Sequence, residues 1–280
     1  MNLIKKIYNF ILTYVVRPVL YRFFVLRWEL FRKPPYYFDY YGYKVYYRPN
    51  DGLVYHIGSL GSFEKDVITC CQKLISRNSV VIDVGANIGL ITIPLVRKIP
   101  GSVFHCFEPS TYPYEYFKLT IKKNKLSKRV ILNKNGLYNK SGKLKFFLHH
   151  FKDASGDGIK DTLRAGEAKP TLIKVTTLDK YVDNQKIKRV DLIKADVEGS
   201  EIFVFKGALK TIRKFRPSIV FEAWPKNLEA YNLNVISLYD FFKSINYSVY
   251  RLNRKLLTKE LFLKENQIQG NYLALSNGKD

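Results

Sequence analysis

Two acidic residues end two short apolar runs and could together hold a nucleoside. Asp83 follows the β-branched run Val80–Ile82, and Glu108 follows the run Val103–Phe107, 25 positions after Asp83. Gly85 lies just beyond the first acid, where a residue without Cβ lets a ligand approach the main chain. A carboxylate at the tip of the next strand can accept hydrogen bonds from two ribose hydroxyls. The pattern predicts a nucleoside site at one edge of a parallel sheet.

The turn after Asp83 narrows the choice of ligand. Asn87 and Gly89 open a predicted helix over residues 88–98, whose first N–H groups would suit a carboxylate or a phosphate. The register Gly85-x-Asn87-x-x-Leu90 lacks the second glycine of a dinucleotide fingerprint, and the chain has no P-loop. S-adenosylmethionine fits, because it has a ribose and a small charged end but no pyrophosphate. The alternative is that Asp83 only caps a helix and Glu108 is a solvated strand end.

A second constellation lies at the end of the apolar run 190–195. Lys194 lies within this predicted strand and Asp196 follows its end. Glu198 precedes Gly199, where the chain is expected to turn into a helix. Since ligands of open α/β sheets bind at the carboxyl ends of strands, Asp83, Glu108, Asp196 and Glu222 should reach one edge.

Methyl transfer to a hydroxyl would give these residues distinct roles. The nucleophile, the methyl carbon and the sulfur must be held in line, and a base must take the hydroxyl proton. Asp196 is the predicted base, Lys194 would pair with an acid or orient the acceptor, and Glu198 would orient the substrate or the sulfonium end. The alternatives are a buried Lys194–Glu222 ion pair, and Glu198 and Glu201 as ordinary acids of a first helical turn.

Other side chains that bind metals or transfer protons form no convincing site. Asp196 with Glu198 could hold Mg²⁺, but we expect no metal, because no His, Cys and Asp cluster has metal-ligand spacing. His105 falls within a predicted core strand, and His56 could border the cofactor mouth. The three cysteines show no disulfide pattern, which favours reduced thiols and hence a cytoplasmic protein. The protein would be peripheral on a membrane if its N-terminal segment binds the membrane surface.

The charge points to an anionic partner. The 280 residues carry a net charge of +23, which suits nucleic acid, an anionic lipid surface or a phosphorylated carrier, although a solvated basic surface explains it equally well. Residues 1–33 hold an apolar helical segment with seven basic residues and one acid. It could lie on an anionic membrane, span it or pack on protein; a span would bury Arg17 and Arg22 at high cost.

The remaining pattern divides into a hairpin extension over 34–60 and one α/β domain over 61–280. Aromatic and polar residues alternate over 36–48, and a further short strand is expected at 53–57. Alternating apolar runs then predict strands at 80–84, 103–107, 129–133, 190–195, 217–222, 247–250 and 272–275, with helices at 61–76, 88–98, 112–124, 200–213 and 235–244. A β-rich excursion covers 136–149, and residues 150–170 are expected to form a long loop.

The chain resembles the FkbM-type methyltransferase family. The resemblance rests on Asp83-Val-Gly-Ala-Asn-Ile-Gly89, Phe107-Glu-Pro109, Thr177-Leu-Asp179 and Lys194-Ala-Asp-Val-Glu-Gly-Ser-Glu201, within residues 55–225. It implies a class I, Rossmann-like sheet of seven strands with the last strand antiparallel, and S-adenosylmethionine as methyl donor. It also implies that Asp83 and Gly85 lie at the cofactor, that Glu108 binds its ribose, and that Glu64 borders the site.

The sequence thus predicts an O-methyltransferase for a hydroxyl of a glycan, a glycolipid or a related metabolite. Two rivals stay open: a nucleic-acid methyltransferase, which the net charge favours, and a non-catalytic binding module on a methyltransferase fold. The resemblance does not name the acceptor or the oligomeric state.

Overall fold

The computed structural model describes residues 33–49, 51–54, 57, 61–149, 156–162, 168–265 and 270–278, together with three isolated positions before residue 33. The helix predicted within residues 1–33 and the residue His56 therefore lie outside the described residues. None of the described helices combines the length and the apolar character that a membrane crossing requires.

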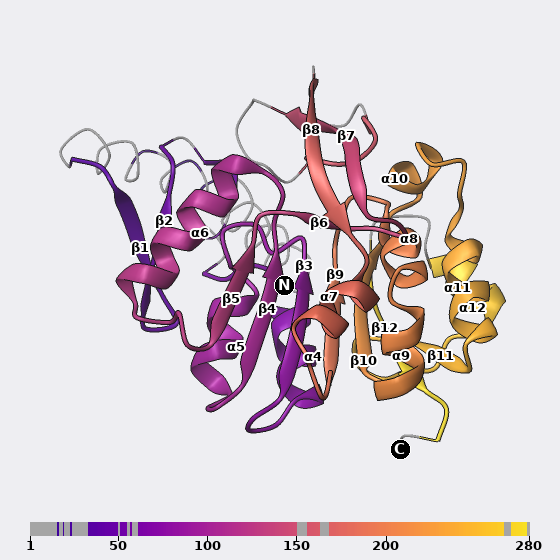
Figure 1. Cartoon of the computed structure of the whole chain (residues 1–280). Helices are drawn as coiled ribbons and strands as arrows, with labels where there is room; N and C mark the ends of the chain where they lie inside the picture. Colours follow the sequence, from indigo (N-terminus) through magenta and orange to yellow (C-terminus); the bar gives the residue numbers. More distant parts are fainter. Residues whose placement is uncertain are drawn as a thin grey trace, which may run out of the picture.

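A seven-stranded sheet forms the centre of the molecule (Figure 1). Its order is β11-β12-β10-β9-β3-β4-β5, and β12 runs antiparallel to both of its neighbours. The other pairings are parallel, as the sequence predicts. The strands are β3 (Val80–Val84), β4 (Val103–Phe107), β5 (Val130–Asn133), β9 (Leu192–Ala195), β10 (Ser218–Ala223), β11 (Tyr247–Arg251) and β12 (Gly270–Ser276).

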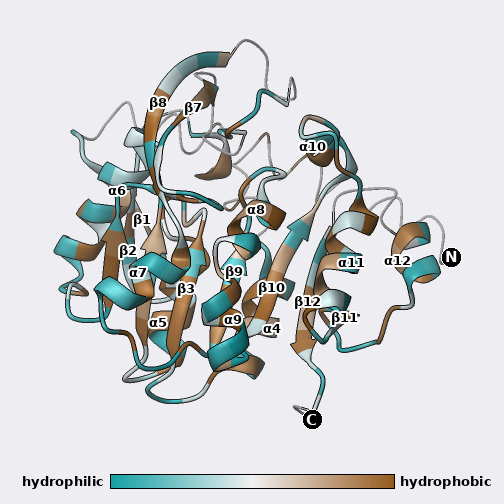
Figure 2. Cartoon of the chain, turned by 45° about the vertical axis from the view of Figure 1, so that its right-hand side comes forward, coloured by the Kyte–Doolittle hydropathy of each residue, from teal (hydrophilic) through white to brown (hydrophobic). Residues whose placement is uncertain are grey.

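Alternating side chains divide the core between the two faces of this sheet. Val81, Leu192 and Val220 pack with α4 (Lys65–Leu74), α5 (Thr92–Lys98) and α6 (Thr111–Lys123). Ile82 and Ile193 point the other way, toward α7 (Leu178–Asn184), α8 (Glu201–Lys206), α9 (Leu209–Phe215), α10 (Pro225–Glu229), α11 (Val235–Ser244) and α12 (Lys259–Glu265). Both faces are thus covered, and the central strands are mostly hydrophobic (Figure 2).

The N-terminal hairpin is confirmed. β1 (Tyr36–Tyr40) pairs antiparallel with β2 (Tyr43–Tyr47), and the Tyr46 N–H donates to Thr120 Oγ1 of α6 at 3.0 Å. The short strand predicted at 53–57 is wrong, because residues 52–54 and 57 are helical. Asp51 explains the start of this helical turn, since its carboxylate accepts the Leu53 N–H at 2.9 Å.

A second, three-stranded sheet is inserted between β5 and α7. It has the order β6-β8-β7, with β6 (Gly136–Leu137), β7 (Gly142–His149) and β8 (Ala168–Thr176). The loop predicted over 150–170 therefore extends too far toward the C-terminus, because residues 168–170 already belong to β8. The predicted helix over 200–213 is two helices, and at the break between them the Gly207 carbonyl accepts the N–H of Asp179 at 3.0 Å.

Candidate active site

A pocket of about 900 Å³, its open mouth included, lies at the carboxyl edge of the seven-stranded sheet. It is lined by the turn after β3, the tips of β4 and β9, the inserted sheet and the segment around residues 157–159. The predicted site residues that line it are Gly85, Asn87, Glu108, Lys194, Asp196 and Glu198; Asp83, Gly89 and Glu64 lie behind its wall.

Glu108 holds the turn that follows β3. Its carboxylate accepts the backbone N–H of Asn87 at 2.9 Å through one oxygen and that of Ser110 at 2.8 Å through the other. Burial raises the pKa of Glu108 to about 7. Because each carboxylate oxygen can accept more than one hydrogen bond, Glu108 keeps capacity for a ribose hydroxyl in the pocket. The residues present therefore fit an adenosyl ligand here.

Gly85 is required by a contact within the protein, and it also lines the pocket, where the sequence predicts the approach of a ligand. Its φ is +76°, and a Cβ at this position would lie 1.8 Å from the backbone carbonyl oxygen of Asp196. The Asp196 N–H donates to the Val84 carbonyl at 3.1 Å. The cofactor turn and the predicted base are thus joined through the backbone, which is a reason for this glycine that the sequence does not show.

The helix after the turn begins at Thr92, later than residue 88 as predicted. The Ile88 N–H is already satisfied by the Asn87 side chain at 2.7 Å. Gly89 has φ +92°, and a Cβ there would lie 2.3 Å from the ring of Phe117. The seven-residue helix α5 therefore does not present its first N–H groups at Asn87 and Gly89, and the predicted start of this helix is wrong.

Asp83 lies directly opposite Lys194 in the pairing of β3 with β9. One Asp83 oxygen accepts the Thr92 hydroxyl at 2.5 Å, and the other is 3.7 Å from Lys194 Nζ. The same ammonium donates to the Gly85 carbonyl at 3.2 Å and lies 3.5 Å from Asp196 Oδ2. The ion pairs of Lys194 thus run to Asp83 and Asp196, instead of the Glu222 pair considered from the sequence.

Glu64 stands behind this group as the N-cap of α4. One of its oxygens is 3.5 Å from Asn271 Nδ2. Burial, with the charge of Asp196 added, raises the pKa of Glu64 to about 7. Burial alone would lower the pKa of Lys194, but the charges of Asp196, Asp83 and Glu64 outweigh it, and the net shift is upward. Lys194 is therefore a permanent cation of the site.

Asp196 and Glu198 face the pocket from the turn after β9. The Asp196 side chain is 21% exposed, so an acceptor can reach its carboxylate. Glu198 adopts φ 55° and accepts a hydrogen bond from Asn227 Nδ2 at 2.7 Å. This bond fixes the direction of the Glu198 carboxylate and suits an orienting role.

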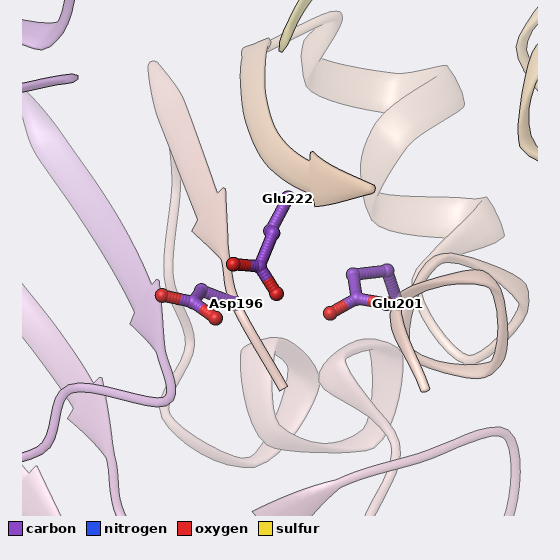
Figure 3. Close-up of side chains that lie close together, drawn as sticks. All are labelled: Asp196, Glu201 and Glu222. Atoms are coloured by element: carbon purple, nitrogen blue, oxygen red, sulfur yellow. The ribbon is translucent and has the colours of Figure 1, made fainter. Parts of the chain in front are cut away.

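Behind Asp196, two buried acids point toward it (Figure 3). Oxygen atoms of Asp196, Glu201 and Glu222 all lie within 4.8 Å of one another. Glu201 accepts the Val197 N–H at 2.9 Å, and burial raises its pKa to about 7. Glu201 is thus more than a helix-start acid, because it also closes the turn that carries Asp196. Carboxylate oxygens are ligands that hard cations prefer, although the sequence predicts no metal here.

The segment 156–162 covers one side of the pocket and belongs to the long loop predicted over 150–170, of which the sequence analysis names no single residue as a site residue. Asp157 lines the pocket, accepts the Ser110 hydroxyl at 2.7 Å and accepts the His149 N–H at 2.8 Å. Gly158, the next residue, lies beside Glu198: a Cβ added to Gly158 would be 3.4 Å from the Cβ of Glu198. The segment therefore touches both the cofactor side and the acceptor side. An acid between two glycines, at 156–158, was the available sequence signal.

The remaining predicted groups lie away from the pocket. His105 shares a hydrogen bond with the Tyr181 hydroxyl at 2.9 Å, and burial lowers its pKa to about 4, which agrees with a structural role. Cys70, Cys71 and Cys106 are buried free thiols.

Comparison with known proteins places these features in a family. The model of the methyltransferase FkbM domain matches residues 83–249. Methyltransferase sdnD of Sordaria araneosa is 27% identical over 175 residues, covering 52% of this chain and 67% of that protein. Hexuronic acid methyltransferase AglP of Haloferax volcanii is 28% identical over 157 residues, covering 56% of this chain and 61% of that protein.

Among solved structures, methyltransferase FkbM of Methylobacillus flagellatus is 18% identical, with a TM-score of 0.47 over 71% of this chain and 44% of that chain. The chain thus spans about three fifths of AglP and less than half of this structure. Since the family model covers more than half of the 280 residues and includes both predicted motifs, the chain belongs to the FkbM methyltransferase family.

Proposed function

We propose that this methyltransferase transfers the methyl group of S-adenosylmethionine to a hydroxyl of a glycan, a glycolipid or a related metabolite. The contact between Gly85 and the Asp196 carbonyl carries the proposal, because it fixes the cofactor turn beside a reachable carboxylate. An enzyme gains most from holding the reacting groups in such a fixed relation.

Each residue has one task in this reaction. S-adenosylmethionine supplies an electrophilic methyl group. Glu108 accepts hydrogen bonds from the ribose hydroxyls, and Asp196 takes the proton of the acceptor hydroxyl. Lys194 holds the Asp196 carboxylate in place, and Glu198, held by Asn227, orients the acceptor.

The acids of the pocket support a neutral hydroxyl as the reacting group. Among the described residues that line it, Glu108, Asp157, Asp196 and Glu198 face a single cation, Lys194. An acceptor carboxylate beside Asp196 and Glu198 would be repelled. AglP is named for hexuronic acid, so its likeness supports a sugar acceptor, while the pocket favours a hydroxyl over a carboxylate as the methylated group.

The test uses labelled S-adenosylmethionine with a cell lysate divided into lipid, glycan, nucleic acid and protein fractions. We expect label in the glycan or lipid fraction, released by conditions that cleave glycosidic bonds. Label in the nucleic acid fraction would replace this proposal with the rival methyltransferase. Absence of cofactor binding in calorimetry would support a non-catalytic module.

The variant Asp196→Asn tests the base. Its transfer rate should fall by about 10²- to 10⁴-fold, with cofactor affinity within about twofold of wild type. Asp183→Asn, on the exposed surface of α7, is the matched control and should keep its rate. If Asp196→Asn loses cofactor affinity while it remains folded, Asp196 belongs to the cofactor site and the assignment is wrong.

A further inference from the structure

The hairpin of β7 and β8 has two faces of different character. Residues directly opposite each other in an antiparallel pair share a face, and successive residues alternate between faces. Leu144 pairs with Ile173, and Phe146 pairs with Thr171. Phe146 and Ile173 are buried and line the pocket, so this inner face belongs to the active site.

The outer face consists of four opposed pairs. One of them, His149 with Ala168, lies at the end of the face, and its histidine is buried beside Asp157 and Asp161. The remaining three pairs are Lys143 with Lys174, Lys145 with Leu172, and Phe147 with Pro170. Phe147 is half-buried, and the other five residues of these three pairs are exposed. Leu172 is 68% exposed, the largest value among the exposed large hydrophobic residues of the described chain. These three pairs thus combine three lysines with apolar residues and contain no acid.

We propose that this outer face docks on a lipid bilayer that contains anionic headgroups. Lysines near such a bilayer are attracted to its negative surface potential, and an exposed leucine between them can enter the acyl boundary. The lysine stems can also lie along the interface while their ammonium groups stay among the headgroups. The proposal does not depend on the identity of the methyl acceptor.

The position of the hairpin agrees with this partner. β7 and β8 stand beyond the carboxyl edge of the large sheet, where the pocket lies (Figure 1). Because the inner face contributes Phe146 and Ile173 to the pocket, the exposed pairs of the outer face are the part of the hairpin that we assign to a partner. Docking there would hold the pocket close to the bilayer, where a lipid-linked acceptor would be presented.

The charges argue against two other occupants of this face. Residues 1–33 carry seven basic residues and one acid, so three lysines would repel that segment. Single-stranded nucleic acid favours exposed aromatic rings and arginine planes for stacking, whereas the exposed pairs of this face contain no arginine and their one aromatic ring, Phe147, is half-buried. An anionic bilayer complements both the lysines and the apolar residues of these pairs.

The test is cosedimentation of the full chain with vesicles of phosphatidylcholine, with or without 30% phosphatidylglycerol as the anionic lipid. Each lysine should contribute about fivefold to partitioning, so Lys143→Glu/Lys145→Glu/Lys174→Glu should lower it by at least 10²-fold. Leu172→Ser should lower it by about tenfold. The triple variant keeps like charges in the Lys143–Lys174 pair, so strand pairing is little altered.

The matched control changes the same number of charges elsewhere. Lys122→Glu/Lys123→Glu/Lys128→Glu replaces three exposed lysines of α6 and its following turn. Retained vesicle binding by the control, with loss in the hairpin variant, would support the proposal. Cofactor affinity within twofold of wild type in the hairpin variant would show that the pocket face of the hairpin is intact.

Two results would overturn the proposal. Equal losses in the hairpin and control variants would mean that net charge alone drives binding. Unchanged vesicle binding in the hairpin variant, with reduced binding to a single-stranded RNA homopolymer, would assign the face to nucleic acid. Neither result would contradict methyl transfer to a glycan, which is measured separately.

Discussion

The variant Gly85→Ala tests the contact on which the proposed active site depends. The added Cβ would lie 1.8 Å from the Asp196 carbonyl oxygen, where real Cβ contacts are longer than 3.0 Å. The tips of β3 and β9 would therefore have to separate by more than about 1 Å, although the Asp196 N–H is hydrogen-bonded to the Val84 carbonyl. The cofactor turn and the Asp196 carboxylate cannot both keep their places.

Two terms contribute to the loss of stability in this variant. Alanine at φ +76° costs about 1 kcal/mol, and forcing apart a packed contact costs about 1–3 kcal/mol more. For a chain of this size, the sum lowers the melting temperature by roughly 5–10 °C. A displacement of about 1 Å between reacting groups should also lower the transfer rate by about 10²-fold.

Gly61→Ala separates these terms. Gly61 has φ +77° and nothing within 4 Å of an added Cβ, so it has the conformational cost without the contact. Calorimetric melting should place Gly61→Ala about 3 °C below wild type and Gly85→Ala well below both. Equal melting temperatures for the two variants, with the transfer rate of Gly85→Ala intact at 25 °C, would refute the backbone contact and the arrangement built on it.

Three further predictions concern the charged groups of the pocket. Burial raises the pKa of Glu108 to about 7, so the unfolded chain loses this proton at lower pH than the folded chain and the wild type loses stability as the pH rises from about 4.5 to 7. In urea titrations over this range, Glu108→Gln should therefore become more stable relative to wild type. The same variant should bind S-adenosylmethionine about tenfold more weakly. Asp157→Asn should weaken cofactor binding about tenfold in calorimetry. Asp161→Asn, on the same segment but outside the pocket lining, should leave cofactor affinity unchanged. Equal effects of the two variants would mean that Asp157 does not contact the cofactor. Lys194→Met leaves the buried Asp83 carboxylate without its cationic partner and should lower the free energy of unfolding by roughly 3–5 kcal/mol. The exposed control Lys210→Met should lower it by less than about 0.5 kcal/mol. Similar values for the two variants would mean that the ion pairs of Lys194 contribute nothing to stability.

The large sheet could be predicted because its signals are local. The runs that end at Asp83, Glu108 and Asp196 are β-branched or aromatic and are separated by helical spacing, which fixes parallel strands. The carboxyl ends of such strands meet at one edge, and this is where the structure brings Glu108, Lys194 and Asp196 together. Local pattern was sufficient wherever the pairing partner was also a strongly apolar strand.

Two features depended on distant contacts and were missed or misread. In β8 the exposed residues Leu172 and Lys174 alternate with Ile173 and Val175, but residues 168–170 lack this alternation and pair only with β7 among the described strands, so they read as loop. The sequence predicts Gly85 only as a place where a ligand can approach the main chain, and the Asp196 carbonyl that packs against it lies 111 positions later in the chain. No pattern confined to the turn itself could have shown this contact.

The distribution of charge separates two kinds of recognition. The chain carries +23 overall, yet the described lining of its pocket holds four acids and one lysine. Exposed charges more than about 8–10 Å away are screened by salt, whereas buried groups are screened much less. The field at the reacting centre is therefore set by Glu108, Asp157, Asp196 and Glu198, and it favours a cationic cofactor and a neutral hydroxyl. The basic exterior acts on what lies outside the pocket, so an acceptor can be anionic as a whole molecule while the group that enters the site is not.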